Sequence, residues 1–194
     1  MSPPCRVRVS GGFVLLAAWF ALANGWEPLA TVLGAAAVHE LGHWAVLRGL
    51  GAEVTGFRLS ALGAVLETDS RKLSYGGELA AVLAGPAANL LAALALTAGG
   101  CWSAAGANLV LCVFNLLPIR PLDGGRALYL MTSWLAGPGA GEAAVRWAGT
   151  LTAAALAAAM GCVIWKTGGS LWLLPALWAS LQWGAAPWLS GAGA

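Results

Sequence analysis

The stretch His39-Glu40-Leu41-Gly42-His43 holds the only two histidines of the chain, and its surroundings decide the fold. Between Pro28 and Leu47 there is no other ionisable residue besides this histidine pair and Glu40, and most of the remaining residues are apolar. That length is about the length of one helical bilayer crossing. Because ionisable groups at membrane depth are costly and are usually retained for function, we expect a site inside a membrane span.

The spacing of the two histidines predicts a metal centre. Residues four apart lie above one another on one face of an α-helix, so His39 and His43 can reach one ion. Zinc accepts imidazole nitrogen readily, and a catalytic zinc takes three protein ligands and keeps a fourth position for water. A carboxylate beside the first ligand can take a proton from that water. We therefore expect one Zn²⁺ held by His39 and His43, with Glu40 as the catalytic base.

The composition indicates a membrane protein. Hydrophobic residues make up 59% of the chain and charged residues only 9%, whereas roughly a quarter of the residues of a soluble domain are charged. The net charge of +2 gives no indication of nucleic-acid binding. The 194 residues suffice for about six spans with short loops. We expect an all-α polytopic membrane protein forming a single domain over residues 1–194, with a core at 7–131 and accessory spans at 142–164 and 171–189.

The amino-terminal part leaves two alternatives open. Arg6 and Arg8 precede an apolar run at 12–23, which is either an uncleaved first span with its positive end inside or a signal peptide cut near Ala23. After the histidine helix, residues 52–74 interleave apolar and polar side chains, with glycines that supply bends. This pattern predicts a short membrane-associated β-hairpin after the second span.

The chain must unwind between Pro118 and Gly125, because two prolines and two glycines cannot continue a regular helix. Irregular backbone at membrane depth is tolerated only where protein or a water-filled cavity surrounds it. The other predicted elements are a bend at 24–28, a third span at 77–96 interrupted at 85–89, a fourth span at 102–117, a short amphipathic helix at 126–134 and a loop at 138–141.

The distribution of cations predicts the topology. With the amino terminus inside, nine of the ten Lys and Arg residues fall on the cytoplasmic side, and only Lys166 falls outside. Cytoplasmic loops carry such an excess of cations. On this topology His39, His43 and Asp123 all lie toward the cytoplasmic side.

Three further polar residues are candidates for the site. Asp123 lies beside Gly124 and Gly125, where backbone can approach closely, and is the best third zinc ligand. The alternative is an aspartate that caps the following helix. Asn89 and Asn115 either bond a neighbouring helix, as amides in apolar spans usually do, or hold a substrate carbonyl or the Asp123 loop.

Three motifs, taken together, resemble the site-2 protease family of intramembrane zinc metalloproteases. They are His39 to His43, then Gly85-Pro86-Ala87-Ala88-Asn89, then the segment from Asn115 to Gly125, and they occur in this order within about residues 7–131. Within the family the chain looks most like the stage IV sporulation branch, which cleaves an inactive sigma-factor precursor. That branch usually carries a carboxy-terminal regulatory domain, whereas this sequence ends at Ala194 after its last predicted span. The periplasmic PDZ insertion of the envelope-stress branch is not visible either.

The resemblance implies a function and a set of residues. It implies one zinc ion on His39, His43 and Asp123, with Glu40 as the base, and a hairpin near 59–67 that pairs with an extended substrate. The implied partners are a transmembrane or membrane-associated protein substrate, the lipid bilayer and a regulatory membrane protein. The implied location is the bacterial cell membrane, as a multi-pass protein.

Two other functions compete with this interpretation. A zinc transporter or carrier would need further ionisable or thiol ligands spaced through the membrane, and the sequence offers one cluster. A non-catalytic family member that only binds substrates would not require His39, Glu40, His43 and Asp123 to be intact. We therefore expect an intramembrane zinc endopeptidase, with a non-catalytic metal-binding or transport protein as the alternative.

Overall fold

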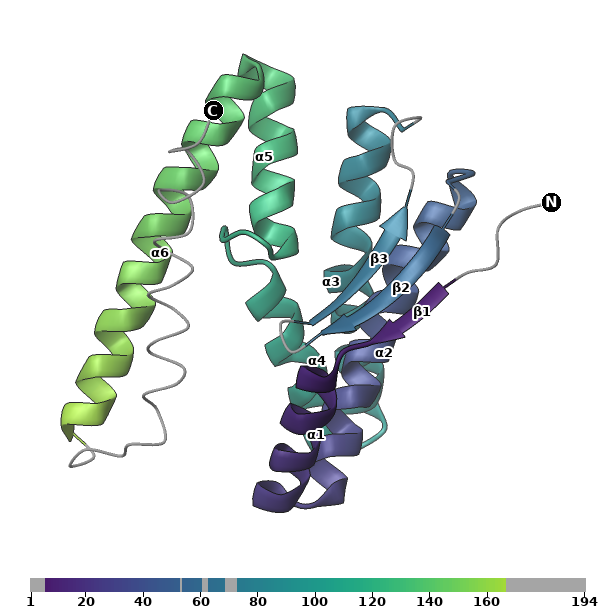
Figure 1. Cartoon of the computed structure of the whole chain (residues 1–194), viewed down its shortest axis with the longest axis vertical. Helices are drawn as coiled ribbons and strands as arrows, with labels where there is room; N and C mark the ends of the chain where they lie inside the picture. The colour runs from purple at the N-terminus through teal and green to yellow at the C-terminus, as the bar shows by residue number, and fades with distance from the viewer. Residues whose placement is uncertain (1–5, 53, 61–62, 69–72, 167–194) are drawn as a thin grey trace. The chain divides into compact units, whose positions relative to one another are not determined.

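The computed structural model describes residues 6–52, 54–60, 63–68 and 73–166. In this part of the chain, helices predominate and the strands form one small sheet (Figure 1). The chain divides into two compact units, Met1–Asn115 and Leu116–Ala194, and each is described by itself.

The first unit contains four helices whose ends follow from their sequence. Ser10 and Ser74 are N-caps, whose hydroxyl oxygens accept hydrogen bonds from the backbone N–H groups of Phe13 and Gly77. Gly25 has a φ of 92°, which favours glycine, and it alone separates the first two helices where a longer bend was predicted. The helices are α1 (Gly11–Asn24), α2 (Trp26–Gly49), α3 (Tyr75–Ala98) and α4 (Trp102–Asn115).

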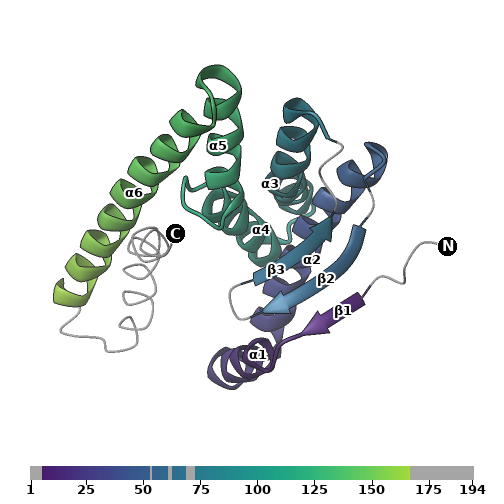
Figure 2. The same cartoon turned by 45° about the horizontal axis from the view of Figure 1, so that its top comes forward.

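The predicted hairpin is confirmed, but the sheet has a third strand that the sequence analysis missed. β2 (Val54–Ser60) pairs with β3 (Gly63–Thr68) in antiparallel fashion, and β1 (Arg6–Val9) pairs with β2 in parallel. The strand order is β1-β2-β3, and the sheet lies against α2 (Figures 1 and 2). The alternation of arginine and valine in β1 is typical of a strand, although we interpreted it as the charged start of a membrane segment.

Helix α3 packs against both α2 and α4, and it runs without interruption through Pro86. The predicted interruption at 85–89 is therefore wrong. A proline inside a helix lacks one hydrogen-bond donor, but neighbouring helices can make up for such a loss. Because the helix continues, Gly85 and Asn89 stand on one element at adjacent turns.

The second unit contains the predicted unwound segment, but this segment spans residues 116–122, because the next helix already begins at Asp123 and not at Arg126 as predicted. The amphipathic helix is also present as α5 (Asp123–Ala136). The backbone of the unwound segment lies close to the start of α5: a side chain on Gly124 would collide with Leu116, and one on Gly125 would come within 2.7 Å of the Ile119 backbone. These two glycines allow the chain to fold back on itself.

Helix α6 (Pro138–Lys166) packs against α5 and begins earlier than predicted. The predicted loop at 138–141 is wrong, because Gly137 alone makes the turn with a φ of 89° and the helix starts at Pro138. Proline is favoured at the first helical position, where its missing N–H group is not needed. Arg120 and Glu142 form an exposed ion pair of 2.9 Å within this unit.

Two of the described helices, α3 and α6, are long and apolar enough to cross a membrane. Helices α1 and α4 are apolar but have 14 residues each, which corresponds to about 21 Å against a hydrocarbon core of about 30 Å. The number of six spans therefore stays a prediction. The predicted span at 171–189 lies outside the described residues.

We predict that Gly42→Ala destabilises the first unit. A methyl group at Gly42 would lie 2.7 Å from the Ala88 side chain and 2.5 Å from the Ala84 carbonyl oxygen, so α2 and α3 would have to move apart. Such overpacking costs about 1–3 kcal/mol. The measurement is the midpoint of unfolding in mixed detergent micelles.

The matched control is Gly34→Ala on the same helix, where an added methyl group meets nothing within 4 Å. This variant should be neutral or more stable by about 0.5–1 kcal/mol, because alanine loses less backbone entropy than glycine in a helix. Equal midpoints for the two variants would contradict the close approach of α2 and α3.

Candidate metal centre

The two histidines of α2 direct the same ring nitrogen toward one point. The Nε2 atoms of His39 and His43 are 3.1 Å apart, and the rings meet edge to face with centroids 4.7 Å apart. His39 is buried and His43 is half-buried. The spacing of four residues on one helix, which the sequence analysis singled out, thus brings both rings together.

The remaining nitrogen of His43 is engaged by a backbone group. Its Nδ1 atom is 2.8 Å from the carbonyl oxygen of Ala81 in α3. A carbonyl oxygen can only accept a hydrogen bond, so Nδ1 carries the proton and donates it. In the neutral ring the Nε2 atom then carries an electron pair and no hydrogen.

His39 is held in the same manner by a side chain. Its Nδ1 atom is 2.7 Å from the amide oxygen of Asn89, which lies on α3 and is completely buried. With Nδ1 as the donor in both rings, the short distance between the Nε2 atoms of His39 and His43 brings two electron pairs together and is no hydrogen bond. Two ligand nitrogens on a tetrahedral zinc ion, each about 2.0–2.1 Å from it, would lie roughly 3.3 Å apart. The pair therefore fits a zinc ion.

Gly85 lets the backbone of α3 pass directly beside the rings. A side chain at this position would collide with His43 and would come within 2.8 Å of the Cε1 atom of His39. The glycine of the second sequence motif thus leaves room for the two histidine rings of the first motif, because only a residue without Cβ fits there.

Glu40 and Asp123 stand on different units. Glu40 follows His39 on α2 and is half-buried. Asp123 is the first residue of α5 and is half-buried as well. The N-cap position of α5 belongs to Leu122, so the alternative that Asp123 is the capping residue receives no support.

The two asparagines singled out in the sequence have different surroundings. The alternative that an amide bonds a neighbouring helix is confirmed for Asn89, which bonds His39 and the Ala35 carbonyl oxygen of α2. Asn115 is half-buried, and its Nδ2 atom donates to Leu111 one turn earlier in α4. A substrate contact of either residue stays a prediction.

Asn108 was not among the residues predicted for the site. It is buried in α4, and its amide oxygen accepts a hydrogen bond of 2.8 Å from Nδ2 of Asn89. A signal was available, because Asn108 and Asn115 are seven residues apart and therefore share one face of an otherwise apolar helix.

Comparisons with known proteins bear on the fold and the chemistry. No family model matches the chain. The chain is 34% identical over 131 residues to "Putative zinc metalloprotease Rip3" of Mycobacterium tuberculosis, and this match covers 60% of the chain and 33% of that protein. It is 33% identical over 102 residues to "Putative zinc metalloprotease sll0528" of Synechocystis sp., which covers 46% of this chain and 27% of that protein. The chain thus spans a third or less of the curated relatives it matches.

A solved structure matches over nearly the whole chain. It is the site-2 protease from Methanocaldococcus jannaschii, with a TM-score of 0.64 and 22% identity, over 92% of this chain and 90% of that one. The fold is that of a site-2 protease. This match confirms the predicted helical fold class with its hairpin and the resemblance that rested on three motifs, whereas the six spans stay a prediction. The sporulation branch is not confirmed by these relatives.

We predict that Gly85→Ala lowers the metal affinity of the histidine pair. The added methyl group would push both rings out of the positions that direct their Nε2 atoms to one point. Zinc content of the detergent-purified protein, measured by elemental analysis after dialysis against a weak chelator, should fall well below that of the wild type.

The matched control is Gly76→Ala in the first turn of α3, where a methyl group meets nothing within 4 Å. Its zinc content should equal that of the wild type. Full zinc retention in Gly85→Ala would show that the rings do not need this space.

Proposed function

We propose that this protein is an intramembrane zinc endopeptidase. The observation that carries the proposal is the geometry of the two histidines, whose Nε2 atoms converge at 3.1 Å while each Nδ1 atom is occupied. Glu40 stands beside this pair on the same helix, which is the arrangement that zinc-dependent peptide hydrolysis uses. The site-2 protease fold and the names of the two curated relatives support the same activity.

One zinc ion would be held by His39, His43 and Asp123. Bound zinc would polarise the substrate carbonyl and make an attacking water more acidic. Asp123 is proposed as the third ligand because a catalytic zinc takes three protein ligands and carboxylate oxygen is one of the accepted donors. Asp123 directly follows the unwound segment and precedes two glycines that let the backbone pack closely, and this position supports the role.

Glu40 would move the proton. Its carboxylate accepts a proton from the attacking water and delivers it to the amide nitrogen that leaves the scissile bond. The bond that forms joins the water oxygen to the substrate carbonyl carbon, and the bond that breaks is the peptide C–N bond. The residue therefore acts first as base and then as acid within one turnover.

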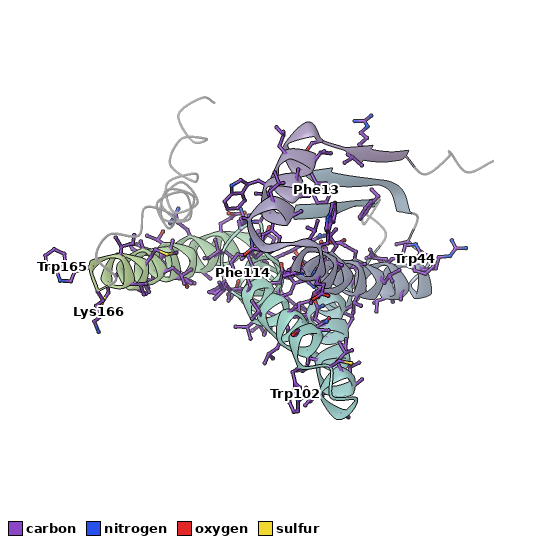
Figure 3. All side chains as sticks on the ribbon, turned by 90° about the horizontal axis from the view of Figure 1, so that it is seen from below. Phe13, Trp44, Trp102, Phe114, Trp165 and Lys166 are labelled. Carbon is purple, nitrogen blue, oxygen red and sulfur yellow. The ribbon has the colours of Figure 1, made fainter. Side chains whose placement is uncertain are left out.

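The exposed side chains support a multi-pass location in the membrane. Large apolar side chains are exposed along the helices, among them Leu91, Val110 and Leu151, and such a surface is typical of contact with lipid and not with water. Trp102 at the start of α4 points away from the helices of its unit, as do Trp165 and Lys166 at the end of α6 in theirs (Figure 3). Tryptophan is enriched at membrane interfaces. The bacterial cell membrane, with the site toward the cytoplasm, is the proposed location.

The substrate would be a membrane-embedded or membrane-associated protein. Peptide bonds inside a helix are shielded, so a substrate helix must unwind before its carbonyl group can be attacked. Strand β1 pairs with one edge of β2, so β3 carries the other edge of the hairpin in the described sheet. An extended substrate segment would add to β3 through backbone hydrogen bonds. Asn89 and Asn115 were predicted as substrate contacts. Asn115 keeps that place in the proposal, whereas the amide oxygen and both amide hydrogens of Asn89 are used within the protein. A sigma-factor precursor and a regulatory membrane protein remain proposed partners.

We predict that Glu40→Gln removes proteolysis and leaves zinc in place. Glutamine has the same shape but cannot accept the proton, and loss of general acid–base catalysis costs about 10²–10⁴-fold in rate. The measurement is cleavage of a panel of tagged transmembrane proteins by the purified enzyme, beside its zinc content. An undiminished rate would contradict the mechanism. Zinc without cleavage of any substrate by the wild type would favour the metal-binding or transport alternative.

We predict that Asp123→Ala loses zinc as His43→Ala does, because each removes one of three ligands. Elemental analysis should find about one zinc per chain in the wild type and far less in both variants. The control is Glu142→Ala, which removes an exposed carboxylate of the same unit. If Asp123→Ala holds zinc as well as this control does, then Asp123 is not a ligand.

A further inference from the structure

A chain of hydrogen bonds starts at His39 and passes through two asparagines. The Nδ1 atom of His39 lies 2.7 Å from Oδ1 of Asn89, and Nδ2 of Asn89 lies 2.8 Å from Oδ1 of Asn108. The Nδ2 atom of Asn108 donates in turn to the carbonyl oxygen of Ala104 at 2.9 Å. The chain crosses three helices, from α2 through α3 to α4, and every side chain in it is buried.

The partners of Asn89 fix which way its amide points. Its Nδ2 atom donates to Asn108 and also to the carbonyl oxygen of Ala35 at 2.9 Å, so both of its hydrogens are used. If the amide were turned over, its oxygen would face two acceptor oxygens, which cannot donate to it. The oxygen of Asn89 must therefore face His39.

The orientation of Asn108 is fixed in the same manner. Its Nδ2 atom is committed to the Ala104 carbonyl oxygen, which can only accept, and this leaves its oxygen for Asn89. Each amide therefore selects the orientation of the next one. Asn108 reinforces the orientation that the Ala35 carbonyl oxygen also gives to Asn89. It does so although it lies outside the three sequence motifs and does not touch either histidine in the contacts described.

We propose that Asn89 and Asn108 are positioning residues that hold His39 in the tautomer with the proton on Nδ1. This tautomer leaves the electron pair on Nε2, the atom that faces His43. A group that accepts a hydrogen bond from the other ring nitrogen of a ligand histidine raises the metal affinity, because it holds the ring and its tautomer. The inference rests on the proposed function only in that the ion is zinc, and it adds Asn108 to the residues on which the site depends.

The two asparagines should contribute unequally. Loss of the Asn89 side chain would leave the Nδ1 proton of His39 without its acceptor. Loss of the Asn108 side chain would leave Asn89 still held by Ala35, so that its orientation is weakened but not lost. The order of effects expected from this network is therefore Asn89 first and Asn108 second.

Histidine ring spectra would test the proposal on the metal-free full-length protein. The chain has only two histidines, so ¹⁵N-histidine labelling gives two sets of ring signals, and His43→Gln assigns them. We expect His39 of the wild type at neutral to mildly basic pH to be protonated on Nδ1. Asn89→Leu should shift the ring toward the other tautomer, and Asn108→Leu should shift it partly.

Zinc affinity, measured by competition with a chromophoric chelator, gives the second readout. Asn89→Leu should bind zinc about 10–100-fold more weakly than the wild type, and Asn108→Leu should lie between the two. Asn89→Asp keeps an acceptor oxygen for His39 but loses the N–H donors to Ala35 and Asn108, so its zinc affinity should lie between those of Asn89→Leu and the wild type. Thr97→Val on α3 removes a hydrogen bond to Ala93 away from the site and is the control, with no change in either readout.

An unchanged tautomer and an unchanged affinity in Asn89→Leu would overturn the proposal, and the same result in Asn108→Leu would overturn the role of that residue. If Asn89→Leu does not fold, Asn108→Leu and Asn89→Asp still decide between the outcomes. A wild-type protein that binds no zinc would contradict the proposed function, while the spectra of the metal-free protein would decide this inference separately.

Discussion

The metal centre depends on how closely α2 and α3 approach each other. Gly42 on α2 and Gly85 on α3 have no side chains, and any side chain at either position would collide with the other helix or with the histidine rings. At this distance the groups behind the rings, the Ala81 carbonyl oxygen and the Asn89 side chain, are within hydrogen-bond reach. A helix pair separated by a normal layer of side chains would leave both Nδ1 protons without these acceptors. The positions of both histidine rings thus depend on the two glycines.

The same principle recurs in the second unit, where glycines let one piece of backbone lie on another. Gly124 and Gly125 lie against the unwound segment, and Gly141 of α6 lies against Ser133 and Tyr129 of α5. Small residues allow helices in membranes to pack closely, since the lipid offers no hydrophobic force that drives them together. Asp123 directly precedes Gly124 and Gly125, and the contacts of these glycines with the unwound segment hold its backbone in place.

Much of this structure was visible in the sequence because its signals are local. The histidine spacing, the alternation that predicts the hairpin and the proline and glycine pairs of the unwound segment each depend on neighbouring residues. Features that depend on a distant partner could not be predicted from the sequence. Strand β1 needs β2, about fifty residues away in the register that pairs Val7 with Phe57, and α3 continues through Pro86 within a packed bundle. Asn108 gained its importance only from Asn89, which packing brings to it from another helix.

The parallel pairing of β1 with β2 has a consequence for the path of the chain. Strand β1 leads into α1, and β2 follows α2. The start of α1 and the end of α2 are therefore both joined to the same sheet. Two parallel strands require such a crossover connection. Because the two strands are parallel, β2 begins at the end of the sheet where β1 begins, so the chain between Val9 and Val54 must travel back along the full length of the strands. The pairing of β1 with β2 therefore ties the end of α2 to the start of α1 across more than forty residues of chain, and it would be lost if either helix ran in the opposite direction.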